Sequence, residues 1–252
     1  MRHRRHVALD HGANGFLLYG IVGAVECLAL RLIFRPIMLA LRKSASQHPS
    51  GFVEPCRPSK VARPPSGPQW VHEIKHDGFR LMVRREGTRV RCFTKGGHDW
   101  ADRFPGIVEA ASRLKAASFL IDGEAVIVRD DGLSDFDALR SRRRDHDAML
   151  FAFDLIEHQG DDLRDLPLLA RKQRLASVLG KADSALRFNE HLAHDDGAVV
   201  FEHACRMGLE GIVSKRIDAP YRSGPSRTWL KSKNPLSEAV RREREEDWTS
   251  RG

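Results

Sequence analysis

The segment E-I-K-H-D-G-F-R at 73–80 constrains the fold and the chemistry of this chain more than any other stretch. Alternating apolar and polar residues at 70–75 predict a strand, and Asp77-Gly78 predicts a tight turn before a second strand at 79–85. A lysine at a strand end beside a glycine lies where a ligand and the backbone can approach closely. The segment therefore predicts either a β-hairpin with an exposed lysine or a nucleophile, Lys75, in a cleft.

A nucleophilic lysine must first lose its proton. The free side chain has a pKa of about 10.4, so the amine attacks only where burial or neighbouring cations lower that pKa. Arg80 and lysines later in the chain are the cations that the sequence offers. We therefore expect a lowered pKa at Lys75.

Short motifs follow this segment, and each has an ordinary structural explanation. Asp-Gly is a common turn, Phe153 lies in an apolar run that predicts core packing, and lysines alternate along many amphipathic strands. A glutamate at a strand end, such as Glu124 or Glu210, usually faces solvent. The motifs are F-T-K-G-G at 93–97, F-L-I-D-G-E at 119–124, L-F-A-F-D-L at 150–155, E-G-I-V-S-K at 210–215 and W-L-K-S-K at 229–233.

In order and spacing, the complete set resembles the motifs of the ATP-dependent DNA ligases. These enzymes belong to the covalent nucleotidyltransferases, as do RNA ligases and mRNA capping enzymes. The resemblance covers roughly Phe52 to Pro235. It implies an adenylation domain in which Lys75 becomes covalently linked to AMP. Independent turns and strands have no reason to reproduce one nucleotide site in this order.

The resemblance implies roles for the residues that match the family's nucleotide-binding motifs. Glu73 is expected to contact the adenine, and Arg80 the ribose and phosphate side of the nucleotide. Phe153 is expected to stack on the base. Lys231 and Lys233 are expected to hold the α-phosphate, where fixed positive charge stabilises the transferring phosphoryl group.

The remaining matches concern the ribose and a metal ion. Lys95 stands where the family usually has an arginine, so bidentate contact is not expected there. Glu124 matches a ribose or metal position, and Glu210 a metal position. Carboxylate oxygens suit Mg²⁺, which neutralises a triphosphate. The expected co-substrate and cofactor are therefore ATP and Mg²⁺.

In the family, lysyl-AMP passes its adenylate to a 5′-phosphate at a nick, and the 3′-hydroxyl then displaces AMP. The resemblance therefore implies nicked duplex DNA as the partner, in repair or recombination. The alternatives are an RNA ligase or capping-type nucleotidyltransferase, and a truncated, partly active remnant. The segment D-L-P-L-L-A-R-K-Q-R-L at 165–175 favours the DNA ligases, because it resembles a helix of those enzymes.

Charge and cysteine content agree with a basic nucleic-acid enzyme. The formal net charge is +8, but residues 1–43 hold seven Lys or Arg against two acidic residues, so much of the excess lies outside the motifs. Local basic clusters are the candidates for DNA contact, with a solvated face as the ordinary alternative: Arg84, Arg85, Arg89, Arg91 and 140–144. Four scattered cysteines predict neither a disulfide framework nor the zinc module of NAD-dependent ligases.

The sequence predicts an α+β fold of antiparallel β-sheets flanked by helices, as in the nucleotidyltransferase domain of DNA ligases. We expect a basic and apolar N-terminal segment at 1–46, a Pro/Gly/Ser-rich connector at 47–68, the adenylation domain at 69–235 and a charged tail at 236–252. Strands are expected at 70–75, 79–85, 89–94, 118–128, 149–157, 186–190, 210–216 and 228–233, and helices at 105–116, 167–180 and 196–207.

The two ends of the chain carry further expectations. Residues 1–46 are either an upstream extension, with translation starting at Met38, or a membrane-associated helix; their apolar run is too short for a span. We favour the extension, no stable membrane association and a cytoplasmic location. After Pro235 only a short helix or tail is expected, so the OB-fold of DNA ligases is absent and a separate OB-fold or repair protein becomes a candidate partner.

Overall fold

The structure is a computed structural model that describes residues 49–180 and 185–249, without the side chains of 247–249. All of these residues belong to one compact unit, His48–Gly252. The expectations for residues 1–46 lie outside the described residues. No helix within the described ranges is long and apolar enough to cross a membrane.

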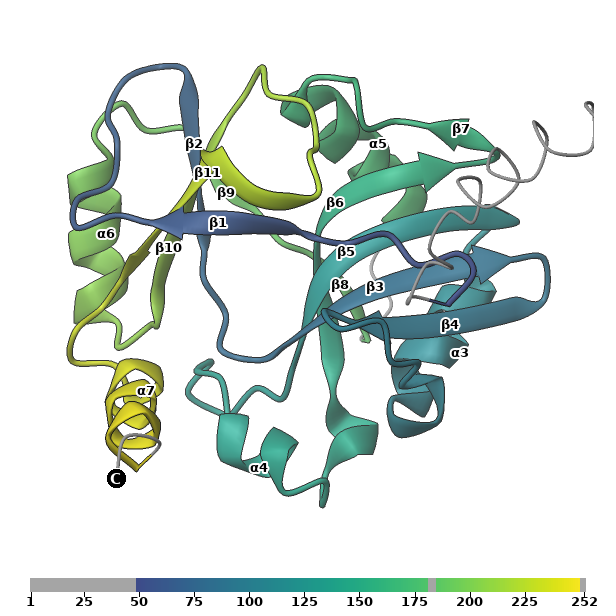
Figure 1. Cartoon of the computed structure of the whole chain (residues 1–252), viewed down its shortest axis with the longest axis horizontal. Coiled ribbons are helices and arrows are strands. Elements are labelled where there is room, and N and C mark those ends of the chain that lie inside the picture. Colours follow the sequence, from purple (N-terminus) through teal and green to yellow (C-terminus); the bar gives the residue numbers. More distant parts are fainter. Residues whose placement is uncertain (1–48, 181–184, 250–252) are drawn as a thin grey trace, which may run out of the picture. The chain divides into compact units, whose positions relative to one another are not determined.

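The described residues form two β-sheets, on the left and the right of Figure 1. The first sheet has the order β1-β11-β10-β2-β9 and consists of β1 (Cys56–Lys60), β2 (Trp70–Ile74), β9 (His191–Leu192), β10 (Gly211–Arg216) and β11 (Gly224–Lys233). The second has the order β4-β3-β5-β6-β7, with β8 paired to β6; it consists of β3 (Phe79–Glu86), β4 (Arg89–Thr94), β5 (Ser118–Val126), β6 (Met149–His158), β7 (Asp161–Asp162) and β8 (Leu186–Phe188).

Helices flank both sheets, so the predicted α+β class is confirmed. In Figure 1, α6 covers the outer side of the first sheet, and α3 and α5 lie behind the second. The helical elements are α3 (Pro105–Arg113), α4 (Phe136–Arg140), α5 (Leu168–Leu179), α6 (Gly197–Arg206) and α7 (Glu238–Thr249), with 3-10 turns η1 (Ala101–Arg103) and η2 (Asp145–Asp147).

The segment between β2 and β3 differs from the predicted hairpin. The two strands belong to different sheets, and 75–78 crosses from one to the other. Lys75 N still donates to Gly211 O at 3.0 Å, which holds the start of the crossing to the first sheet. A Cβ on Gly78 would lie 2.1 Å from Ala125 O of β5. Gly78 is therefore required by close packing against the second sheet.

The segment at 47–68 also differs from the connector that the sequence predicted. Within it, β1 pairs in parallel with β11 and forms an edge strand of the first sheet. Pro55 before the strand and Pro58 within it hid β1, because proline cannot donate to a sheet ladder and is tolerated mainly at edges. The buried hydroxyl of Tyr221 accepts a hydrogen bond from Cys56 N at 2.8 Å and so fixes β1.

Three hydrophobic clusters hold the sheets and helices together. The largest lies between the second sheet and its helices, where Leu175 of α5 and Ile107 of α3 are buried. A second joins the two sheets, with Met82 and Trp229 on opposite sides. The third packs α6 on β10. The second cluster fixes one sheet against the other and thereby the space between them.

Candidate active site

Residues from both sheets enclose a cavity of about 240 Å³ beside the end of β2. Its lining contains most of the residues that the sequence predicted for the nucleotide: Glu73, Lys75, Arg80, Lys95, Glu124, Phe153 and Lys231. Lys75 also borders a second cavity of about 230 Å³, which Glu210 and Asp77 line. Lys75 therefore separates the nucleotide cavity from a smaller acidic one.

Strand register places the side chains of the first sheet on one face. Val213 of β10 pairs with Glu73 of β2 on one side and with Lys231 of β11 on the other. Because side chains two residues apart share a face, Lys215 and Lys233 project to the same side. The motifs at 73–75, 210–215 and 229–233 thus meet because antiparallel pairing aligns them.

A glycine at the start of β10 allows β10 and β11 to pack closely. Gly211 has a φ of +143°, and a Cβ there would lie 2.1 Å from Ser232 O. No other residue fits a position with both constraints. The glycine of the E-G-I-V-S-K motif therefore allows β11 to approach closely enough to bring Lys233 beside Glu210.

Lys75 and Glu210 form an ion pair in which Lys75 Nζ donates to Glu210 Oε2 at 2.6 Å. The Glu210 side chain is 5% exposed and that of Lys75 22%. Burial acts to lower the pKa of Lys75, but attraction from Glu210 and Glu124 outweighs it, and the pKa is raised. The expected lowered pKa of Lys75 is therefore wrong for this arrangement. Arg80, the expected cation, pairs with Asp122 instead.

Glu124 presents a carboxylate to the cavity without a direct partner. Within the described part of the chain, its side chain makes no hydrogen bond or ion pair. Burial raises its pKa to about 7, although Lys75 and Arg80 act in the opposite direction. A half-buried carboxylate in this condition favours an added cation.

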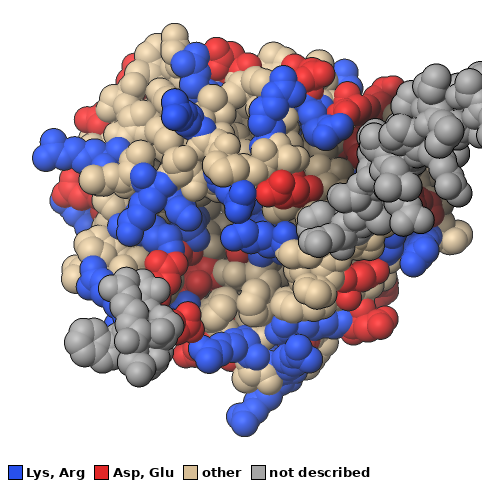
Figure 2. All heavy atoms as spheres, viewed as in Figure 1, with Lys and Arg blue, Asp and Glu red and all other residues tan. Residues whose placement is uncertain are grey.

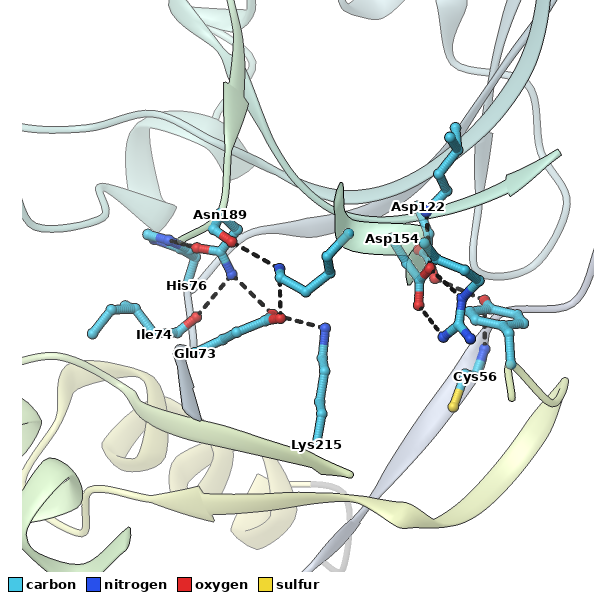
Figure 3. A network of polar contacts seen from close by, with 12 residues as sticks. Cys56, Glu73, Ile74, His76, Asp122, Asp154, Asn189 and Lys215 are labelled. Atoms are coloured by element: carbon cyan, nitrogen blue, oxygen red, sulfur yellow. Dashed lines mark hydrogen bonds and ion pairs between the residues drawn. The ribbon is translucent and has the colours of Figure 1, made fainter. Parts of the chain in front are cut away.

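Glu73 lies at the centre of a buried polar network (Figure 3). Its Oε1 accepts from Lys172 Nζ at 2.8 Å, and its Oε2 lies 2.7 Å from Lys215 Nζ. Asn189 Nδ2 donates to Oε2 at 3.3 Å. Burial alone raises the pKa of Glu73, but the two lysines outweigh it and hold the pKa below its ordinary value. Both oxygens of the predicted adenine contact are thus already engaged.

Phe153 belongs to the core and also lines the cavity, so its stacking on the base stays a prediction. It is 7% exposed and makes an edge contact with Trp229 at 6.1 Å between ring centroids. The Arg80 guanidinium lies 4.4 Å from its ring centroid, as does Lys215 Nζ. Cations at this distance interact favourably with the ring. A base that stacks on Phe153 has to share its surface with them.

Arg80 is held by a bidentate ion pair. Its Nε and Nη2 donate to Asp122 at 2.5 and 2.7 Å, and Asp122 also accepts from the Tyr221 hydroxyl at 2.7 Å. Burial opposes the charge on Arg80, but Asp122 outweighs burial and raises its pKa. This arrangement fixes the guanidinium, since a planar fork matches a carboxylate.

The lysines predicted for the phosphates lie around the end of β11. Lys233 Nζ is 3.4 Å from Glu210 Oε1 and also pairs with Glu243 of α7. Lys231 lines the nucleotide cavity, and burial followed by repulsion from Lys233 and Lys75 lowers its pKa. Lys95 is exposed at the cavity mouth. Lys75, Lys231 and Lys233, named here the lysine cluster, therefore form one positive region.

Several residues of the site were not predicted from the sequence. Lys172 had a usable signal, because it lies on the buried stripe of α5 together with Leu168 and Leu175. A charged residue on such a stripe requires a buried partner. Asn189 gave no signal, since it follows a three-residue strand outside the motifs. The α7 contacts were not predicted, because the charged composition of this segment indicated a short helix or a tail without partners.

The donor set around Lys75 suits Mg²⁺ better than a softer metal. Within the described residues, no group of three or more His, Cys, Asp or Glu side chains could hold a metal ion alone. Mg²⁺ usually binds through one or two carboxylates, with water and phosphate oxygens as the other ligands. Glu124 and Glu210 both attract the charge of Lys75, so both carboxylates lie near its amine. These two carboxylates fit that requirement.

Comparison with known proteins reveals relatives across most of the chain. Multifunctional non-homologous end joining protein LigD of Pseudomonas aeruginosa is 39% identical over 189 residues, which cover 73% of this chain and 22% of that protein. A DNA ligase of Natronomonas pharaonis is 34% identical over 64% of this chain and 31% of that protein. The chain thus spans less than a third of the length of either relative.

Solved structures with the same fold include mycobacterial ligases. The ligase domain of M. tuberculosis LigD gives a TM-score of 0.63 at 27% identity, covering 72% of this chain and 60% of that one. A mycobacterial DNA ligase D complexed with ATP and MES gives 0.63 at 29% identity, with the same coverage. The model of the ATP dependent DNA ligase domain matches residues 53–233, well over half of the chain. The chain therefore belongs to the family of ATP-dependent DNA ligase domains.

Proposed function

We propose that this chain uses ATP to form lysyl-AMP on Lys75 and transfers the adenylate to a 5′-phosphate in nicked duplex DNA. The observation that carries the proposal is the position of Lys75. Its amine lies beside Glu210, between a nucleotide-sized cavity and an acidic one, with further lysines at the same sheet end. A lysine with a purely structural role does not require a carboxylate partner, two adjoining cavities and further lysines at the same place.

The cavity suggests how ATP lies in it. The base enters beside Phe153, where Val213 of the first sheet also lines the wall. Glu73 and its network shape the inner end of the cavity. Arg80, held by Asp122, faces the ribose and phosphate side, and the α-phosphate reaches the lysine cluster. This orientation places the α-phosphorus next to Lys75 Nζ.

The first chemical step forms an N–P bond between Lys75 and the α-phosphorus and breaks the bond to the pyrophosphate oxygen. The lysine cluster stabilises charge that develops on the phosphoryl oxygens, and Lys75 must lose a proton to attack. Glu124 and Glu210 would hold Mg²⁺, which neutralises triphosphate charge when bound. Without the attraction of Glu210, burial of Lys75 would favour its neutral amine, which is the form that attacks.

The surface around the cleft supports a nucleic-acid partner. In Figure 2, lysine and arginine side chains border a hollow in the middle of the face shown. Positive charge next to a cleft attracts phosphate backbones and makes binding dependent on salt.

In the second step, the phosphate oxygen at the nick attacks the AMP phosphorus and Lys75 leaves. The 3′-hydroxyl then attacks the activated phosphate and releases AMP.

We also propose a cellular role for this chain from the function of a relative. Because a LigD relative is described as a non-homologous end joining protein, we place this chain in DNA break repair in the cytoplasm. A separate OB-fold or repair protein is the partner that we propose for complete ligation.

The proposed function is tested by incubating the protein with α-labelled ATP and Mg²⁺. We expect a covalent adduct that Lys75→Ala and Lys75→Arg abolish, because arginine stays protonated. Lys115→Ala is the matched control, since this lysine is exposed and lies outside the nucleotide cavity. An adduct that survives the Lys75 substitutions would reject the assignment. Sealing of nicked DNA compared with nicked RNA then identifies the acceptor.

A further inference from the structure

Two neighbouring residues of α7 contact two different parts of the proposed active site. Glu243 pairs with Lys233 of the lysine cluster, and Arg242 pairs with Asp77, two residues after the nucleophile. In Figure 1, α7 follows β11 and lies below the first sheet. Two polar contacts of this mainly charged helix thus lie at the proposed active site.

Glu243 lies where an anion is expected to bind. Its carboxylate accepts from Lys233 Nζ, whose side chain is 9% exposed, while Glu243 itself is 53% exposed. Lys75 and Lys231 also attract it, and together with Lys233 they outweigh burial and lower the pKa of Glu243. The same three lysines are those that the proposed function assigns to the nucleotide phosphates.

Arg242 gives α7 a second attachment at the site. Its guanidinium donates to Asp77 Oδ2 and lies 4.5 Å from the centre of the Phe136 ring. The paired carboxylate belongs to the segment that crosses between the sheets. Arg242 therefore holds the helix in place without entering the lysine cluster, and α7 can keep this attachment when Glu243 leaves Lys233.

We propose that the Glu243 carboxylate acts as an internal competitor that occupies the phosphate position at Lys233 and must be displaced when ATP binds. This inference rests on the proposed function, because it takes the lysine cluster as the phosphate site. A triphosphate carries several negative charges, so it repels a carboxylate at the same lysine. Glu243 leaves with little cost, because half of its side chain already contacts solvent.

The test is the ATP dependence of the first turnover of lysyl-AMP formation in the full chain. For Glu243→Gln we expect the half-saturating ATP concentration to fall about two- to fivefold, the range for an exposed ion pair, with the maximal rate little changed. Glu246→Gln removes the same charge from the same helix but pairs with Arg140, outside the lysine cluster. We expect no change in that control.

The outcomes separate this inference from the proposed function. If wild-type protein forms no adduct, the proposed function fails. If the adduct forms and Glu243→Gln leaves half-saturation unchanged, raises it, or lowers only the maximal rate, the competition is rejected while the function stands. A fall of similar size in Glu246→Gln would also reject it, since the effect would then be one of net charge.

Hydrogen exchange on the wild-type chain provides a test that does not depend on a variant. We expect faster exchange of backbone amides at 238–249 when the protein is saturated with α,β-methylene ATP, which Lys75 cannot cleave. Loss of the contact between Glu243 and Lys233 releases one attachment of α7 and so increases local opening. Unchanged or slower exchange in a protein that demonstrably binds the analogue would overturn the proposal.

Discussion

Lys75 Nζ lies 2.6 Å from Glu210 Oε2, so the proposed nucleophile is paired with a proposed metal ligand. The pairing has two opposite consequences. Glu210 keeps the lysine charged and unreactive, yet its carboxylate is one of the two groups that suit Mg²⁺ at this position. Under the proposed function, binding of Mg²⁺ by Glu210 would therefore also release the amine of Lys75 from its carboxylate partner.

The first prediction separates the two roles of Glu210. Glu210→Gln removes the charge that raises the pKa of Lys75, and it also removes a metal ligand. We expect the second effect to dominate and lysyl-AMP formation to slow about 100-fold, the scale for losing one electrostatic contact to the transition state. Single-turnover rates measure it, with exposed Glu202→Gln as the control. A faster variant would mean that Glu210 only restrains Lys75.

A second prediction concerns the base. Phe153→Ala should weaken ATP binding by about 1–3 kcal/mol, the value of a base stacked on an aromatic ring. Phe153→Trp keeps a π surface and should retain most of the affinity. Calorimetric titration measures both. Because Phe153 is 7% exposed, circular dichroism must confirm folding; an unfolded Phe153→Ala together with a Phe153→Trp that does not bind would favour a core role alone.

The third prediction is non-additivity around Glu73. Lys172→Met or Lys215→Met leaves one cation on the buried carboxylate, so each should cost about 1 kcal/mol of the free energy of unfolding. The double variant leaves Glu73 with no cation, a condition that costs about 3–5 kcal/mol. Urea unfolding of the wild type, both single variants and the double variant measures the four free energies that this comparison requires. A double variant equal to the sum of the singles would show that the network does not act as a unit.

Much of the fold could be predicted from the sequence, because it depends on local periodicity. The alternation at 70–74 and the buried stripe of α5 specify strand and helix without knowledge of the partner. The predictions that were wrong depend on contacts between residues that are far apart in the sequence. The Asp77-Gly78 pair indicates a hairpin locally, yet its strands belong to different sheets, since Gly78 is selected for its contact with Ala125 rather than for a turn.

The candidate site likewise contains some features that could be predicted from the sequence and others that could not. Residues such as Lys75 and Glu210 belong to motifs, and antiparallel register brings the motifs together, so their convergence could be expected. The charge state of Lys75 could not, because it depends on a pairing across 135 positions of sequence. Asn189 and Glu243 also enter the site through tertiary contacts that no periodic pattern specifies.

The fourth prediction is a loss of stability in mild acid caused by His76. This ring stacks on Phe151 at 3.9 Å between centroids, and Nε2 donates to Asn189 at 3.1 Å. Burial lowers its pKa from 6.5 to about 4. The unfolded chain then binds more protons between these values, so stability falls as pH drops from 6.5 towards 4, by at most about 3 kcal/mol.

His76→Gln isolates this contribution. The variant should lose less stability than the wild type between pH 6.5 and 4 in urea unfolding. Some pH dependence should remain, because burial also lowers the pKa of His72. Exposed His98→Gln should follow the wild-type profile. Equal slopes for His76→Gln and the wild type would show that His76 is not held neutral by the fold.

The last prediction concerns DNA affinity and Arg142 and Arg143, which lie between α4 and η2. Both are exposed, and their side chains form no ion pair with any described residue, whereas Arg144 pairs with Asp147 at 2.7 Å. Free guanidinium groups are the ones able to neutralise DNA phosphates and release counterions. We expect the combined variant Arg142→Gln and Arg143→Gln to bind nicked DNA more weakly and to reduce the slope of log affinity against log salt by about 2.

Arg206→Gln, exposed on α6 and paired with Glu202, is the matched control and should leave the slope unchanged. Fluorescence anisotropy across a salt series measures both, and an unchanged slope in the combined variant would show that Arg142 and Arg143 do not contact the DNA phosphates.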